Sequence, residues 1–288
     1  MQVTVIGAAN IDIKAKSKTS IIREDSNPAD VSMKAGGVAR NIAAMLAKYN
    51  AQVHLITAVG NDPFGKMLQE SCKTLGINTD AWIIKKKAST GVYVAALEDD
   101  GELYTAFNAT SVQESIKTSE ITKHKKLILN SDLLVLDLNL SEKILNLAIE
   151  LRDRRPIMVD AVSVAKVPRL EGFIDKIDVL KLNRIEAEHL TGIILDTKER
   201  VMQASRQIVS YGVKRVFVTL GVAGVCAADS HGEIIVPAVP TPVKDVTGAG
   251  DAFAAGIAMN ISKTLRTQAQ AGVMFAAEHL RSKNEKIH

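Results

Sequence analysis

Short runs of aliphatic and β-branched residues alternate along the chain with longer segments whose apolar positions recur every three to four residues. The strand-like runs are residues 3–7, 53–59, 133–137, 157–160, 179–182 and 216–220. The helical spacing joins Val38, Ile42, Met45, Leu46 and Tyr49, and again Ile144, Leu147, Ala148 and Leu151. Continuous apolar strands that alternate with helices are typical of a parallel sheet covered on both faces. Because crossovers between parallel strands are right-handed, we expect a doubly wound, mainly parallel α/β sheet flanked by helices.

Two stretches interrupt this alternation. Residues 12–35 and 83–108 contain short alternating strands with polar turns, such as Asp99-Asp100-Gly101-Glu102, which favours a hairpin. We expect these insertions to pair into a small β-sheet that covers a cleft as a lid. No internal repeat or long linker divides the chain, so residues 1–288 are predicted to form a single domain that carries this lid.

Composition and charge exclude several classes of protein. With 288 residues, 47% of them hydrophobic and 24% charged, the chain is neither disordered nor of low complexity. The net charge of +4 is spread along the chain, which argues against nucleic acid as a partner and suits a small anionic ligand. Neither a signal peptide nor a charge-free apolar stretch of about 18 residues is present, so we expect no membrane partner and a soluble, cytoplasmic protein.

The most informative stretch is Asp245-Val246-Thr247-Gly248-Ala249-Gly250-Asp251, which precedes a helical pattern. Gly248 and Gly250 would let a charged group approach the backbone, and the N–H groups of a helix start bind anions. A carboxylate there would repel a bound phosphate, yet Asp251 suits a general base beside a phosphoryl group in transfer. The alternative is a glycine-rich turn in which Asp251 only complements the helix dipole. The local residues leave both interpretations open.

Polar residues follow two of the predicted strands, at the edge where open α/β sheets bind their ligands. Asn10 and Asp12 follow the first strand and Asp137 ends the third, where carboxylates can hold sugar hydroxyls, although Asx turns explain them equally well. The tract Gly36-Gly37-Val38-Ala39-Arg40-Asn41 opens the first helix. Its glycines would admit a ligand and Asn41 can bond to hydroxyls, while a plain strand-to-helix turn is the alternative.

Two later strand ends suit a nucleotide. Asn183 and Glu186 lie three residues apart and can face one cleft, where a carboxylate could order the waters around Mg²⁺; a capping box is the alternative. The stretch Thr219-Leu220-Gly221-Val222-Ala223-Gly224 suits the edge of a nucleotide, or a loop between two strands. The GxxxxGK spacing at residues 60–66 is no P-loop, because Met67 stands where Ser or Thr is required.

Taken in order, these motifs resemble the ribokinase-like family of sugar and nucleoside kinases, also called the phosphofructokinase-B type. The resemblance runs from about Val3 to Leu280 and rests on the order and spacing of the motifs. It implies a kinase that uses ATP and Mg²⁺, with Asp251 as the catalytic base and Gly248, Ala249 and Gly250 as the anion hole. The residues implied to hold the sugar are Asn10, Asp12, Gly36, Gly37, Asn41 and Asp137. Those implied along the nucleotide are Asn183, Thr219, Gly221 and Gly224, with Glu186 near the metal.

Potassium is a further cofactor that the resemblance raises. In potassium-dependent members of the family, the segment matching Val243, Lys244 and Asp245 lies beside a monovalent cation. The resemblance therefore leaves a requirement for K⁺ open.

Within the family, the tract Arg23-Glu24-Asp25-Ser26-Asn27-Pro28 is most similar to the pseudouridine kinases, which also share the GGVxRN tract. This likeness implies pseudouridine, phosphorylated at its 5′-hydroxyl, as the substrate. It also implies that Ser26 and Asn27 reach the base and that Lys166 contacts a phosphate. An Asx turn and a solvated lysine are the alternatives.

Other functions remain as alternatives. Within the same fold, ribokinase or another nucleoside or sugar kinase is the alternative activity. From another class, the alternative is a nucleoside sensor without catalysis. Because the strands of a small open sheet have unpaired edges, we also expect a homodimer that forms through the lid.

Overall fold

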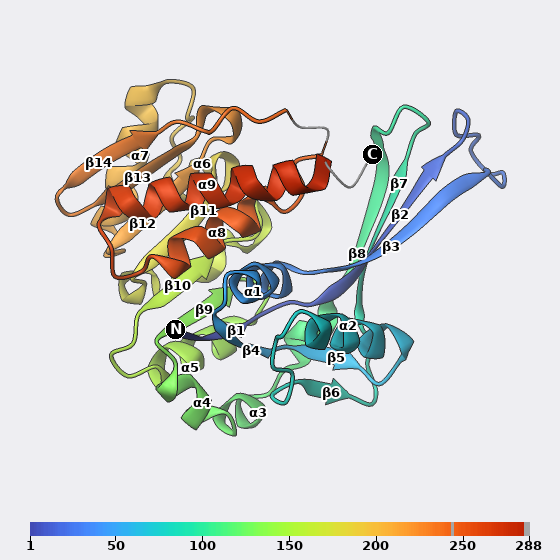
Figure 1. Ribbon diagram of the computed structural model, residues 1–288, viewed down its shortest axis with the longest axis horizontal. Helices are drawn as coiled ribbons and strands as arrows, with labels where there is room; N and C mark the ends of the chain where they lie inside the picture. Colours follow the sequence, from blue (N-terminus) through green and yellow to red (C-terminus); the bar gives the residue numbers. More distant parts are fainter. Residues whose placement is uncertain (243–244, 285–288) are drawn as a thin grey trace.

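The computed structural model describes residues 1–242 and 245–284, and its largest element is an eight-stranded sheet (Figure 1). In spatial order the strands are β14 (Gly232–Val236), β13 (Val225–Asp229), β12 (Arg215–Thr219), β11 (Val179–Asn183), β10 (Ile157–Asp160), β9 (Leu133–Asp137), β1 (Gln2–Ile6) and β4 (Gln52–Ile56). The pairs from β12 to β4 are parallel, whereas β12–β13 and β13–β14 are antiparallel. The predicted mainly parallel sheet is confirmed.

Helices contribute to a separate apolar cluster on each face of this sheet. The helices of one cluster are α3 (Thr118–Thr122), α4 (Lys125–Asn130), α5 (Glu142–Leu151), α6 (Arg184–Thr191) and α7 (Lys198–Ser210). Those of the other are α1 (Val38–Lys48), α2 (Pro63–Thr74), α8 (Ala249–Met259) and α9 (Leu265–Asn284). Successive strand residues enter opposite clusters, so Val216 and Val218 join the first and Phe217 the second. Because both faces are buried, the strands are continuous apolar runs.

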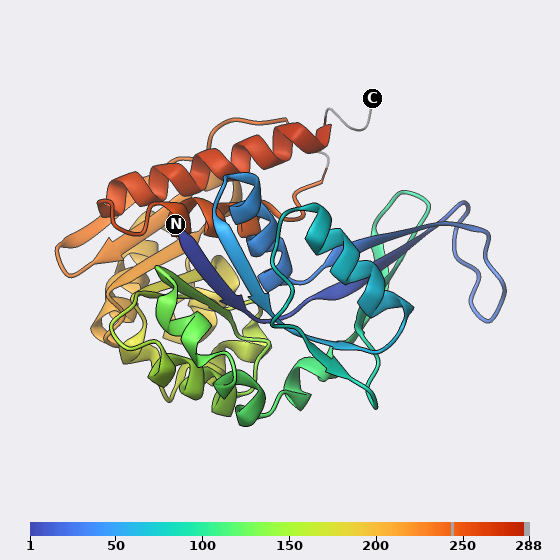
Figure 2. The same cartoon turned by 60° about the horizontal axis from the view of Figure 1, so that its bottom comes forward.

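A separate four-stranded sheet projects from this body (Figures 1 and 2). Its strands, in order, are β3 (Ala29–Gly36), β2 (Asn10–Ser17), β7 (Gly91–Leu97) and β8 (Leu103–Ala109). We call it the small sheet. Its register places a polar row, Lys34, Asp12, Tyr93 and Asn108, on one face. The next row, on the opposite face, is apolar and consists of Met33, Ile13, Val94 and Phe107.

The predicted strand 53–59 was wrong in one respect, because the chain forms two strands there. After β4 the chain leaves the large sheet, and β5 (Ala58–Gly60) pairs with β6 (Ile83–Lys85) in a two-stranded sheet. Thr57, which separates them, is buried and accepts a backbone hydrogen bond from Ile83 at 2.9 Å. Residues 83–85 therefore lie outside the small sheet, although the predicted insertion 83–108 includes them.

The remaining regular elements are short 3₁₀ turns, at Ser111–Ser115, Val164–Leu170, Ile174–Lys176 and Gly221–Ala223. The two cysteines, Cys72 and Cys226, are buried free thiols in opposite apolar clusters. Over the two described ranges, no helix is both long enough and apolar enough to cross a membrane.

Candidate active site

Helix α8 begins at Ala249 and carries Asp251 in its first turn. Gly248 precedes it with a φ of 83°, in the left-handed region that glycine adopts without strain. The first N–H groups of an α-helix have no carbonyl partner within the helix, so they can bind an anion. A Cβ on Gly250 would lie 3.3 Å from the Lys181 ammonium, so glycine lets this cation lie against the helix start. The anion-binding backbone, the carboxylate and a lysine therefore meet at one place.

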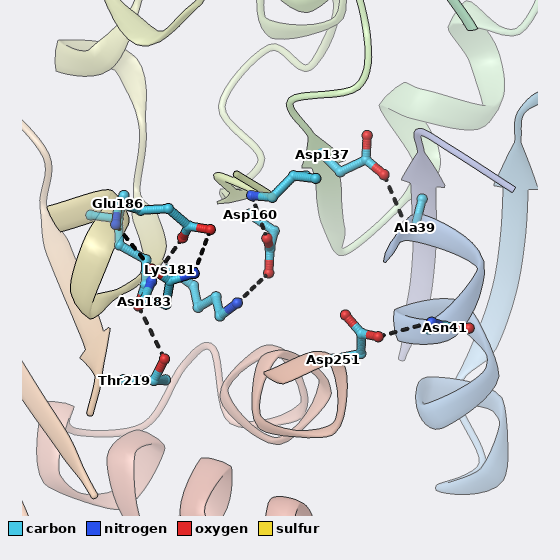
Figure 3. Close-up of polar contacts among 11 residues, drawn as sticks. Ala39, Asn41, Asp137, Asp160, Lys181, Asn183, Glu186, Thr219 and Asp251 are labelled. Carbon is cyan, nitrogen blue, oxygen red and sulfur yellow. Dashed lines mark hydrogen bonds and ion pairs between the residues drawn. The ribbon is translucent and has the colours of Figure 1, made fainter. Parts of the chain in front are cut away.

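Asp251 faces helix α1 across the site. The amide of Asn41 donates a hydrogen bond to Asp251 Oδ2 at 2.9 Å, and the two residues lie 210 positions apart in the chain (Figure 3). Gly37 caps α1 with a φ of 96°, and a Cβ there would lie 2.4 Å from the carbonyl oxygen of Ala8. This close approach requires glycine and brings the first turn of α1, with Asn41, against the end of β1.

Asn10 and Asp12 lie at the start of β2, and the Asn10 amide donates a hydrogen bond to Asp12 Oδ1 at 2.6 Å. A Cβ on Gly36 would lie 2.3 Å from Asp12 Oδ2, so the glycine leaves room for this carboxylate across the strand pair. Burial raises the pKa of Asp12, against the opposite effects of the Asn10 hydrogen bond and of Lys14. Asp12 offers carboxylate acceptors and Asn10 an amide that both donates and accepts, and such a pair can bind hydroxyls.

Asp12, Asn41 and Asp251 line one pocket of about 200 Å³, whereas Asn10 is not among its lining residues. Its walls come from the small sheet, from α1, and from the ends of α8 and α9; the polar residues that line it are Asp12, Lys14, Ser32, Lys34, Arg40, Asn41, Asp245, Thr247, Asp251, His279 and Lys283. The polar face of the small sheet thus lies opposite the start of α8. Asp12 and Asp251 therefore line the same pocket.

Asp251 is more basic than an ordinary aspartate. Burial raises the pKa of Asp251 to about 6, and the negative charge of Asp160 acts in the same direction. The Lys181 cation and the Asn41 hydrogen bond act in the opposite direction. At neutral pH the group is therefore ionised but close to its pKa, which is the condition that a general base requires.

Lys181, in the middle of β11, is a functional candidate that the sequence analysis missed. Only 7% of the residue is exposed, and its ammonium lies 3.0 Å from Asp160 Oδ2, as Figure 3 shows. Burial alone would lower the pKa of Lys181, but the charges of Asp160, Glu186 and Asp251 outweigh it and raise this pKa. The lysine therefore stays charged among three carboxylates. A lysine inside an otherwise apolar strand was the available signal.

Asn183 and Glu186 form a capping box at the start of α6. The Glu186 carboxylate accepts from the backbone N–H of Asn183 at 2.8 Å and from its amide at 2.7 Å. In the part of the chain that the structure describes, no three His, Cys, Asp or Glu residues are grouped so as to hold a metal. This arrangement does not fit direct coordination of Mg²⁺. It fits a hydrated ion carried by phosphates, since Mg²⁺ keeps several waters in such sites.

Thr219 ends β12, and Gly221 and Gly224 lie in the turn that follows this strand. The Thr219 hydroxyl donates to the carbonyl of Leu182 at 3.3 Å, which joins this strand end to β11. Gly224 has a φ of 95°, and a Cβ there would lie 2.1 Å from the carbonyl oxygen of Val236. Between the glycines, Val222 is 98% exposed and presents an apolar surface to solvent.

Asp137 and Lys166 are not among the residues that line the pocket. Asp137 is fully buried, and its Oδ2 accepts backbone hydrogen bonds from Ala8 at 2.9 Å and Ala39 at 3.0 Å. The Lys166 ammonium donates to the side chain of Asn139. These contacts give Asp137 a structural part, because it ties β9 to the first turn of α1. Its role toward a sugar stays a prediction.

Ser26 and Asn27 lie in the loop between β2 and β3, at the outer end of the small sheet (Figure 1). The Asn27 side chain accepts from the N–H of Ile22 and donates to its carbonyl, both at 2.8 Å, and Asp25 Oδ1 accepts from the N–H of Ser26 at 2.7 Å. Neither residue is among those that line the pocket. The local Asx turn accounts for their contacts, and contact with a base stays a prediction.

The loop before α8 is only partly within the described structure. Val243 and Lys244, which the resemblance places near a cation, lie outside the described residues. Asp245 and Thr247 are described, and both are bonded to Lys283 of α9. Lys283 is a second lysine that sequence reasoning missed, and no sequence pattern distinguished it.

Comparison with known proteins gives a consistent result. The sequence matches the family described as pfkB family carbohydrate kinase over residues 1–286. It is 35% identical to the pseudouridine kinase of Escherichia coli (strain K12) over 257 residues, which are 89% of this chain and 82% of that protein. It is 26% identical to the guanosine-inosine kinase of Exiguobacterium acetylicum, over 98% of this chain and 95% of that protein.

Solved structures show the same fold. A carbohydrate kinase from Agrobacterium tumefaciens superposes with a TM-score of 0.85 at 29% identity, over 96% of this chain and 89% of that one. The ribokinase of Arabidopsis thaliana complexed with ribose and ATP superposes with a TM-score of 0.86 at 23% identity, over 97% and 92% of the two chains. The family match covers nearly the whole sequence, and both similar structures superpose over 96% or more of this chain. The chain therefore belongs to the pfkB family of carbohydrate kinases.

Proposed function

We propose that this kinase transfers the γ-phosphoryl group of ATP to the 5′-hydroxyl of pseudouridine and releases pseudouridine 5′-phosphate and ADP. The observation that carries the chemistry is the basic carboxylate of Asp251, held by Asn41 at an anion-binding helix start beside a polar pocket. The choice of pseudouridine is supported by the 35% identity to the Escherichia coli enzyme and by the Asp25-Ser26-Asn27 tract.

In this proposal Asp251 removes the proton of the substrate hydroxyl. The oxygen then bonds to the γ-phosphorus as the bond between that phosphorus and the ADP oxygen breaks. The N–H groups at Gly248, Ala249 and Gly250 bind the charge on the group in transfer. Asn41 orients the carboxylate, and Lys181 balances the surrounding negative charge.

The sugar is assigned to the other wall of the pocket. Asp12, which lines the pocket, and Asn10, which is bonded to it, bind its hydroxyls, while Gly36 leaves room for the Asp12 carboxylate and Gly37 lets α1 approach the end of β1. The small sheet, which carries Asp12, acts as the lid and excludes water that would otherwise accept the phosphoryl group.

The nucleotide is assigned to the ends of β11 and β12. The phosphates lie near Asn183, and the base lies along Thr219, Gly221 and Gly224, with exposed Val222 as an apolar surface. A hydrated Mg²⁺ on the phosphates would lie near Glu186 and would neutralise part of their charge.

A smaller substrate such as ribose is the second candidate. One observation favours it, since Ser26 and Asn27, the residues expected to reach a base, bond within their own turn and do not line the pocket. The chain is also 28% identical to the Arabidopsis thaliana ribokinase over 88% of its length.

Competition between substrates tests the proposed function. Pseudouridine, uridine, inosine, adenosine and ribose are offered together with ATP and Mg²⁺, and the phosphorylated products are separated and quantified. We expect pseudouridine 5′-phosphate to dominate. Predominant ribose 5-phosphate would replace the proposal with the second candidate, and nucleoside binding without ATP consumption would identify a sensor.

Replacing the base gives a second prediction. Asp251→Asn keeps the size and the Asn41 contact but cannot accept the proton, so kcat should fall by about 10²–10⁴-fold. Nucleoside affinity, measured by calorimetry, should stay close to the wild-type value, because binding relies on the opposite wall. A variant that keeps near-normal turnover would exclude Asp251 as the base.

The raised pKa of Asp251 predicts the dependence of activity on pH. Only the ionised carboxylate accepts a proton, so kcat/KM should be half-maximal near pH 6, level off about one pH unit above it, and fall by about tenfold per pH unit well below it. In Lys181→Met the cation that favours ionisation is lost, so the acid limb should move to higher pH. Lys263→Met, an exposed lysine, is the matched control and should leave the profile in place. An unmoved limb in Lys181→Met would contradict this role.

A homodimer through the small sheet is the proposed quaternary state. From the sequence, the unpaired strand edges of the small sheet were the argument for a dimer. The apolar row on the face of this sheet away from the pocket is a stronger argument. Met33 is 50% exposed and Phe107 67% exposed on this face. A second copy presents the same row, so an isologous contact covers both at once.

Light scattering after size exclusion tests this assembly. The wild-type chain should elute as a dimer, and the double variant Met33→Glu, Phe107→Glu should be a monomer, because a carboxylate buried without a partner is costly. Ile194→Glu, at a residue 65% exposed and away from the small sheet, is the control and should remain dimeric. A monomeric wild-type chain would refute the proposal.

A further inference from the structure

The C-terminal helix holds the loop that leads into the catalytic helix. The ammonium of Lys283 donates to Asp245 Oδ2 at 3.0 Å and to the backbone carbonyl of Thr247 at 2.7 Å. The ring of His279, one turn earlier on α9, lies with Nε2 3.1 Å from the same carbonyl oxygen. Residues 245–247 are therefore fixed from outside by two side chains of α9.

This loop continues directly into the anion hole. Gly248 follows Thr247, and a Cβ on Gly248 would lie 2.8 Å from His279 Nε2, so the two segments are in close contact. Asp251 then follows in the first turn of α8. A displacement of the loop would move the N–H groups and the carboxylate that act on the phosphoryl group.

A carboxylate and a backbone carbonyl that converge on one point form a site for a small cation of charge +1. Potassium is bound in proteins by rings of such oxygens. An ammonium group carries the same charge and offers three N–H donors to the same acceptors. Although partial burial opposes ionisation, the hydrogen bonds from Thr247 and Lys283 hold the pKa of Asp245 well below its usual range. The carboxylate thus stays ionised opposite the lysine.

The Asp245 carboxylate and the Thr247 carbonyl already have partners. Asp245 Oδ1 accepts from the N–H of Thr247 at 2.8 Å, while Oδ2 and the Thr247 carbonyl both bind Lys283. A potassium ion bound to Oδ2 and this carbonyl would occupy the place of the lysine ammonium and face its like charge. The described residues therefore do not fit an added monovalent cation at this point.

We propose that the ammonium of Lys283 takes the place of the monovalent cation, so that this kinase orders its anion hole without K⁺. Lys283 also lines the pocket, but its role in this proposal is that of a positioning residue, since it acts through its bonds to Asp245 and Thr247 in the loop 245–248. The inference depends on the kinase activity of the family and not on pseudouridine as the substrate.

Exchange of the cation tests the proposal. Turnover is measured in potassium chloride and in tetramethylammonium chloride at equal ionic strength, with whichever substrate the competition experiment identifies. The wild-type rate should differ by less than about twofold between the salts. Lys283→Met should lose about tenfold or more in the organic salt, because small displacements of catalytic groups are costly, and should recover most of that loss in potassium chloride. Arg281→Met, an exposed basic residue on the same helix end, should behave as wild type.

Thermal unfolding without substrate is the second readout. The Tm of the wild-type protein should be equal in the two salts, whereas that of Lys283→Met should be higher in potassium chloride, because a bound ion stabilises the folded state. Strong activation of the wild-type enzyme by K⁺ would overturn the proposal, as would a folded Lys283→Met that responds to K⁺ in neither readout. Should this variant not fold, the wild-type comparison still decides. Failure of pseudouridine as a substrate changes neither readout.

Discussion

A carboxylate that acts as a base beside phosphates has to stay ionised where negative charge is already concentrated. The charges of Asp160 and Asp137 raise the pKa of Asp251. Glu186 is a third carboxylate, and it interacts with the nearby cation of Lys181. The buried cation of Lys181 offsets this negative charge, and it lies against the start of α8 because position 250 is glycine. The side chains at these strand ends and at the helix start must therefore combine positive and negative charges so that Asp251 stays ionised.

The fold could be predicted from the sequence because strands that are buried on both faces of a sheet have continuous apolar sequences. Every strand of the large sheet from β4 to β12 appears as an apolar run, and α1 and α5 appear as helical spacing. The break at Thr57 could not be predicted, since residues 53–59 remain apolar across it. Whether such a run continues in one sheet depends on the pairing of β5 with β6, a distant contact that hydrophobicity does not encode.

The site was predictable where several constraints coincide in one short motif. The residues that flank Asp251, and the glycines before Asn41, need close backbone approach as well as chemistry, and the structure brings both motifs together. Isolated polar residues were not predictable in the same way. An aspartate after a strand looks the same in sequence whether it faces a pocket, like Asp12, or binds backbone N–H groups, like Asp137. Single lysines such as Lys283 have no pattern at all.

The two covalent connections nearest the pocket have a mechanical consequence. Residues 7–9 alone join β1 to β2, and Gly37 alone joins β3 to α1. Asp12 belongs to the projecting sheet and Asp251 to the body, so a tilt of that sheet about these junctions changes the separation of the two carboxylates. In the proposed mechanism, binding of the sugar by Asp12 and alignment of its hydroxyl with Asp251 are therefore a single motion, and a molecule too short to reach both walls would leave Asp251 without its proton donor.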